Sequence, residues 1–141
     1  MPIPEVNYCL VCEGVRPELH NKANILGFFG IIPSVVITVT ELGKNIPILL
    51  FLVGIEGPSD EIKMKAEVLN PDGSLLKASD EVPFPQLKTN ERGLSGFAFA
   101  PIMFSKAGKY SFRALINGQL AYEGSFLVQQ GIPSLQSLSK Q

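Results

Sequence analysis

The sequence predicts an all-β protein, an antiparallel β-sandwich of about eight strands. Apolar and polar residues alternate with a period of two in several segments, as they do when successive side chains of a strand point to opposite faces. Eleven prolines and thirteen glycines in 141 residues indicate frequent turns. No stretch combines helical periodicity, a cap and sufficient length. An up-and-down β-barrel is the alternative architecture.

The first third of the chain predicts three strands. The segments "VNYCLVC" and "NILGFFGI" form two of them, joined by a polar turn around residues 17–22, and the β-branched run "SVVITVTEL" forms the third. A longer apolar run follows from Ile46 to Ile55. It is about half as long as a membrane-spanning helix requires, so we interpret it as a buried central strand.

The segment "EIKMKAEVL", residues 61–69, has the clearest alternation. Its apolar and charged side chains fall on opposite faces, which is typical of an antiparallel strand with one face in water. The sequence "NPDG" at Asn70–Gly73 predicts a tight turn, after which "SLLKAS" returns as the hairpin partner. The charged face is mixed in sign and predicts a solvated surface, with a partner-binding surface as the alternative.

A second hairpin is predicted near the C-terminus. The strands "GKYSFRALI" and "QLAYEGSFLV" flank Asn117-Gly118, the preferred residue pair for a two-residue type I′ turn. Alternation places four residues of the second strand on the buried face: Leu120, Tyr122, Phe126 and Val128. Leu115 and Leu127 then point outward, which predicts a second buried face or a dimer interface.

The segments before this hairpin predict how the two sheets are connected. "SGFAFAPIMF" forms a further strand, in which Pro101 indicates an edge or a bulge. The segment Asp80–Leu94 contains two prolines and predicts a long loop that crosses between the sheets, which favours Greek-key connectivity. We expect residues 1–130 to form a single β-sandwich domain and residues 131–141 a flexible tail.

The composition excludes several classes of function. The net charge is −1, with 45% hydrophobic and 18% charged residues, as in globular proteins. A net charge so close to zero does not predict the positively charged surface that binds nucleic acid or an anionic membrane. The opening "MPIPEVNY" has neither the basic nor the apolar region of a secretory signal. We therefore expect a cytoplasmic protein with reduced thiols.

Cys9, Cys12 and His20 raise the question of a metal or redox site. A structural zinc site needs four ligands, and these three residues would need Glu13 or Glu18 as the fourth. A thioredoxin-like site needs its C-x-x-C at a helix N-terminus, whereas this C-x-x-C lies in a predicted strand. Residues three apart on a strand point to opposite faces, so we expect two buried, structural cysteines whose sulfurs diverge.

No catalytic constellation is predicted elsewhere. The segment "GLSGF" has its second glycine one position too early for a hydrolase nucleophile elbow. The adjacent acids Asp60 and Glu61, like Asp80 and Glu81, lie in predicted turns, where such pairs are usually solvated. We therefore assign no catalytic, cofactor-binding or metal-binding residues and expect no cofactor.

With these strands in place, the chain resembles a family of small bacterial proteins known as a domain of unknown function. The similarity rests on "KANILGFFGIIP", "MKAEVLNPDG" and "AGKYSFRALINGQLAYEGSFLV", and it covers most of residues 6–128. The resemblance implies an immunoglobulin-like sandwich. It implies no activity and no functional residues.

The function expected from the sequence is that of a non-enzymatic interaction or structural module. Its partner would be a protein, including a second copy of the chain, and neither nucleic acid nor a membrane. A protein that binds a small ligand or a metal through the Cys9, Cys12 and His20 region is the alternative. A spacer subunit of a surface or phage-like assembly is a third reading.

Overall fold

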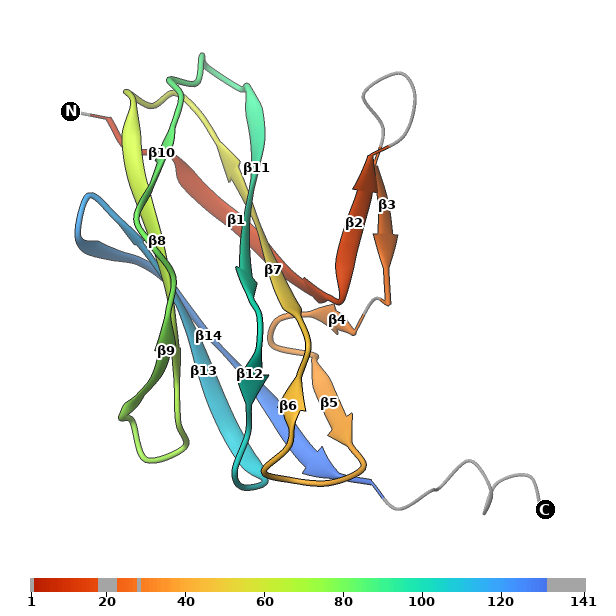
Figure 1. Ribbon diagram of the computed structural model, residues 1–141. Helices are drawn as coiled ribbons and strands as arrows, with labels where there is room; N and C mark the ends of the chain where they lie inside the picture. The colour runs from red at the N-terminus through yellow and green to blue at the C-terminus, as the bar shows by residue number, and fades with distance from the viewer. Residues whose placement is uncertain (1, 18–22, 28, 132–141) are drawn as a thin grey trace.

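The computed structural model describes residues 2–17, 23–27 and 29–131. Within these ranges the chain forms strands and turns and no helix, so the all-β prediction is confirmed. Two sheets pack face to face as a sandwich (Figure 1).

Ten strands make up the two main sheets. The four-stranded sheet runs in the order β11 (Arg92–Phe99), β7 (Leu49–Glu56), β1 (Glu5–Cys12) and β4 (Gly30–Ile31). The six-stranded sheet runs in the order β10 (Val82–Phe84), β8 (Ile62–Leu69), β13 (Gly108–Ile116), β14 (Gln119–Gln130) and β5 (Val36–Val39), with β9 (Leu75–Ala78) also paired to β8. Two short ribbons complete the described strands: β12 (Ile102–Met103) with β6 (Asn45–Ile46), and β2 (Gly14–Pro17) with β3 (Ala23–Leu26).

The connectivity is that of an immunoglobulin-like Greek key. The chain leaves the four-stranded sheet after β7, forms β8 to β10 in the opposite sheet, and returns to pair β11 beside β7. β5 runs parallel to the last strand, β14. At the start of β13 the Tyr110 hydroxyl donates a 2.7 Å hydrogen bond to the carbonyl of Lys106. This bond is the tyrosine corner of immunoglobulin-like sandwiches.

The core lies between the two sheets and is aromatic at its centre. Phe51 of β7 stacks on Phe112 of β13, with ring centroids 4.5 Å apart. Phe104, Tyr110 and Phe126 pack beside this pair. The stacked pair therefore joins the middle strands of the two sheets.

Both predicted hairpins are present. In β8 the alternating apolar side chains Ile62, Met64, Ala66 and Val68 are buried. Asn117 and Gly118 have φ values of 52° and 81°, as the type I′ turn requires. That turn also bonds to β8, because the Lys63 amide donates to the Asn117 side chain at 3.0 Å.

The prediction for Leu120 is wrong. Ala114 opposes Tyr122 but Leu115 opposes Leu120, so Ala121 is an extra residue on β14. A one-residue bulge reverses the faces on either side of it. Leu120 therefore lies on the outer surface, 54% exposed and opposite Leu115, while Tyr122 still faces the core.

Two predicted boundaries also change. The segment Asp80–Leu94 does cross between the sheets, but it contains the edge strand β10 and the first residues of β11. "NILGFFGI" is two strands rather than one, because the chain turns at Gly27, whose φ is +60°. The Gly131 amide donates to the Val39 carbonyl at 2.8 Å, and residues 132–141 of the predicted tail lie outside the described residues.

Candidate interaction surface

The outer face of the four-stranded sheet is apolar. On β7 the core-facing side chains are Leu49, Phe51, Val53 and Ile55, which leaves Leu50, Leu52 and Gly54 facing outward. Register extends this outer row across both neighbouring strands. We call the resulting set the outer face: Tyr8, Leu10 and Cys12 of β1, Leu50, Leu52 and Gly54 of β7, and Leu94, Gly96 and Ala98 of β11.

Exposure differs between the strands of this face. Leu52 of β7 is 4% exposed, and Cys12 of β1 is fully buried. On β11, Leu94 is 48% exposed, and Gly96 and Ala98 beside it are also exposed. The open parts of the outer face are therefore the β11 row and, on β1, Tyr8, which is 40% exposed.

Polar groups gather at one end of the outer face, around Glu56. Its Oε1 accepts hydrogen bonds from Arg92 Nε at 3.2 Å and from Asn7 Nδ2 at 3.4 Å. The Arg92 side chain is 81% exposed, so this ion pair contributes little to stability. Arg92 is the only charged residue of β11, and Glu56 of the neighbouring strand β7 neutralises its charge.

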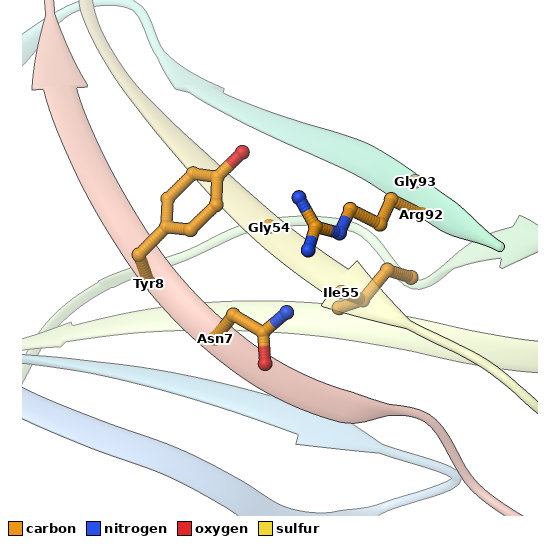
Figure 2. Close-up of a pocket in the computed structure, with 6 residues that line it drawn as sticks. All are labelled: Asn7, Tyr8, Gly54, Ile55, Arg92 and Gly93. Carbon is orange, nitrogen blue, oxygen red and sulfur yellow. The ribbon is translucent and has the colours of Figure 1, made fainter. Parts of the chain in front are cut away.

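A notch of about 270 Å³ lies beside this polar end. Tyr8 of β1 and Arg92 of β11 lean toward one another across β7, and Gly54 forms the floor between them (Figure 2). The notch is smaller than the roughly 300–1,000 Å³ of typical small-molecule sites. Its shape suits a protruding side chain better than a cofactor.

The six-stranded sheet presents a different outer surface. Charged side chains dominate it, including Lys63 and Lys109 and the ion pair between Arg113 and Glu123 at 2.8 Å. Leu127, one of the two leucines predicted to point outward, is 48% exposed beside Val36. Leu115, the other, is half-buried opposite Leu120. The apolar groups here form two small pairs on a charged face.

The cysteines of the C-x-x-C are both free and fully buried. Cys9 belongs to the core between the sheets, whereas Cys12, three positions along the same uninterrupted stretch of β1, lies on the outer face. Burial raises the pKa of both thiols. His20 lies outside the described residues. In the part of the chain that the structure covers, no three His, Cys, Asp or Glu side chains gather as metal ligands would.

The other candidate residues lie apart from the outer face. Asp60 and Glu61 precede β8, and Asp80 and Glu81 precede β10, the neighbouring strand of the same six-stranded sheet. "GLSGF" is not an elbow between a strand and a helix, since it lies within β11. No helix of the described residues has the length and hydropathy needed to cross a membrane.

Comparisons with known proteins give similarity of fold. No protein-family model and no curated protein matches the chain. A Pseudomonas fluorescens alkylpurine DNA glycosylase, solved with DNA containing an abasic site analog, is 14% identical with a TM-score of 0.42, over 70% of this chain and 28% of that one. A CARDB domain from Pyrococcus furiosus, solved with di-metal ions, is 14% identical with a TM-score of 0.41, over 91% of this chain and 89% of that one.

An immunoglobulin-like protein from Pseudomonas aeruginosa is 15% identical, with a TM-score of 0.36, over 90% of this chain and 97% of that one. This chain spans less than a third of the glycosylase. At such identities and TM-scores, the similarity carries no information about activity or ligand.

Sequence reasoning missed the outer face, although one signal for it exists. The run "LLFLVGI" of β7 is apolar at every position, so its outward residues are as apolar as its inward ones. A neighbouring strand with small or apolar residues at alternate positions, such as Leu94, Gly96 and Ala98, completes the face. Which of the two alternating rows faces outward becomes clear only from the pairing of the strands.

Proposed function

We propose that this protein is a non-enzymatic interaction module, and that the open part of its outer face binds another protein, namely a second copy of the chain. The observation that carries the proposal is the row of Leu94, Gly96 and Ala98. This row is exposed, uncharged and continuous with the apolar side chains of β7. Exposed apolar patches with a polar rim are typical of protein-binding sites.

The charge distribution supports a protein partner over nucleic acid. Arg92 is the only charged residue of β11 and is already paired with Glu56. On the opposite sheet the charged side chains are of both signs, and Arg113 lies opposite both Glu67 and Glu123 and forms an ion pair with Glu123. In the part of the chain that the structure describes, there is therefore no single-signed basic surface of the kind that a phosphate backbone requires.

The free cysteines also bear on the cellular compartment of the protein. Two free thiols are expected in a reducing compartment, and we propose the cytoplasm. The resemblance to a bacterial family of unknown function stays a prediction, as does the interface at Leu115 and Leu127.

Sedimentation equilibrium over about a hundredfold range of protein concentration tests the proposal. We expect a reversible monomer–dimer equilibrium that Leu94→Asp weakens by about tenfold or more, because the introduced charge would be desolvated in the interface. Leu127→Asp is the matched control, since Leu127 is equally exposed on the other sheet. A monomer at every concentration contradicts the proposal, and so does a dimer that only Leu127→Asp weakens.

A further inference from the structure

Among the described strands of the two main sheets, β11 is the only one longer than four residues that has no neighbour along the whole of one side. It is eight residues long and ends the four-stranded sheet, with β7 as its only paired neighbour. It contains neither proline nor lysine. Proteins usually protect such edges with prolines, lysines or very short strands, because an unpaired edge can accept another strand.

The other terminal strands of the main sheets have these protections, and the stretches of β1 and β14 that extend beyond their short neighbours β4 and β5 each contain a register irregularity, which also hinders pairing. β4, at the opposite end of the four-stranded sheet, has two residues. β10 has three residues and contains Pro83, and β9 has four residues and contains Lys77. β5 has only four residues. β11 is therefore the described main-sheet edge that is best suited to accept another strand.

From this edge we propose that two copies of the chain pair β11 to β11 in antiparallel orientation around a two-fold axis at Ser95, which joins their four-stranded sheets. This inference rests on the proposed function and places the contact along the β11 edge of the outer face, where Leu94 of each copy meets Gly96 of the other. Because directly opposed residues of an antiparallel pair share a face, a two-fold axis through one residue keeps both apolar rows on the outside.

The sequence of β11 is self-complementary in this register. With Ser95 opposite itself, Leu94 of each copy opposes Gly96 of the other copy. At Gly96 there is no side chain, and the nearest atoms to a Cβ there would belong to Leu52 at 3.3 Å and Leu50 at 3.5 Å. The half-exposed Leu94 would therefore lie against the bare backbone of Gly96 and the Leu52 and Leu50 side chains beside it.

The charges on β11 also permit self-pairing. Arg92 opposes Ala98 of the other copy in this register, so the two arginines lie at opposite ends of the paired strands. Each arginine keeps its own Glu56 partner. Antiparallel pairing therefore brings no like charges together, which would destabilise directly opposed positions.

The expected affinity is modest. Stable interfaces bury about 1,200–2,000 Å² in total, and one strand pairing with two leucine contacts supplies only part of that area. We expect a dissociation constant on the order of micromolar or weaker. A weak dimer of this kind is reversible, which suits an interaction module.

Disulfide cross-linking of Ser95→Cys tests the register. Directly opposed Cβ atoms lie about 4.5–5.5 Å apart, close to the distance that a disulfide spans. We expect mild oxidation to give a covalent dimer on non-reducing electrophoresis. Ala98→Cys is the control. Position 98 of one copy would lie six residues along the strand, or about 20 Å, from position 98 of the other copy.

Sedimentation of the reduced Ser95→Cys variant accompanies the cross-linking and shows whether the variant still associates. A reversible dimer that does not cross-link at position 95 overturns the β11 pairing but leaves the proposed function standing. Efficient cross-linking of Ala98→Cys but not of Ser95→Cys overturns the register. A reduced variant and a wild-type protein that both remain monomeric overturn the pairing and the proposed function together.

Discussion

The ring of Tyr8 lies directly on the backbone of Gly54, so that a Cβ atom at position 54 would come 2.2 Å from two of the ring carbons. The two residues oppose each other in the pairing of β1 with β7. Glycine is therefore required at position 54 by the close approach of the ring, and not by an unusual φ. This contact fixes the floor and one wall of the notch at the polar end of the outer face (Figure 2).

Gly54→Ala is expected to lower the free energy of unfolding by about 1–2 kcal/mol, because the Tyr8 ring must leave its position over β7. Urea denaturation measures the change. In a Tyr8→Ala background the same substitution should cost less, since the obstructing ring is gone. An equal cost in both backgrounds would show that the ring does not rest on Gly54.

Tyr110→Phe removes the hydroxyl of the tyrosine corner and leaves the Lys106 carbonyl without its 2.7 Å hydrogen bond. We expect a loss of about 1–2 kcal/mol in unfolding free energy, as for other buried hydrogen bonds. Tyr122→Phe is the matched control on the adjacent strand, with an expected change within about 0.5 kcal/mol. Chemical denaturation of both variants checks the difference, and equal losses would count against the assigned hydrogen bond.

Gly118→Ala tests the turn between β13 and β14. A side chain at φ +81° is strained even though no other atom lies within 4 Å of the new Cβ. We expect a cost of about 1 kcal/mol or more, measured by thermal unfolding. Gly14→Ala, which also has open space but an ordinary φ, should have a smaller effect. The reverse order would mean that the turn is not of type I′.

Cys9 should make the protein less stable at alkaline pH. Burial, and then the neighbouring Cys12, raise the pKa of the Cys9 thiol from its ordinary value of 9.0. The unfolded thiol therefore ionises at a lower pH than the folded one. The stabilisation is fully present below pH 9 and is lost as the pH rises toward the folded-state pKa, at up to about 1.4 kcal/mol per pH unit.

Urea denaturation at pH 8 and at pH 10 measures this effect. Because tyrosines and lysines also titrate in this range, the comparison is with Cys9→Ala, whose stability should fall less steeply between the two pH values. Identical pH dependence of the two proteins would mean that the Cys9 thiol ionises as easily in the folded state as in the unfolded one.

The fold could be predicted wherever local pattern decides the structure. Alternation fixed the buried face of β8, and Asn117-Gly118 fixed the turn of the last hairpin. Leu120 could not be placed this way, because the bulge opposite Leu115 depends on how β13 and β14 align over their whole length. Alternation alone assumes an unbroken register.

The candidate surface was less predictable than the fold. The apolar run from Ile46 to Ile55 predicts a buried central strand, which is correct for Phe51 and Val53. The outward row of β7, which is Leu50, Leu52 and Gly54, is recognised as part of a surface only from its neighbouring strand. That neighbour is β11, which supplies exposed small and apolar residues, whereas β8 belongs to the other sheet. Pro101, just after β11, indicates an edge or a bulge, and only the sheet order shows that β11 is an edge along its whole length.

We propose that this protein associates through the open edge of β11. A dilution series followed by two-dimensional amide NMR distinguishes this edge from other surfaces, because each backbone amide reports on its own surroundings. We expect concentration-dependent shifts that are largest for β11, including Leu94, Ser95 and Gly96, and small for β13 and β14. Spectra that do not change on dilution, or shifts centred on Leu115 and Leu127 instead, would contradict it.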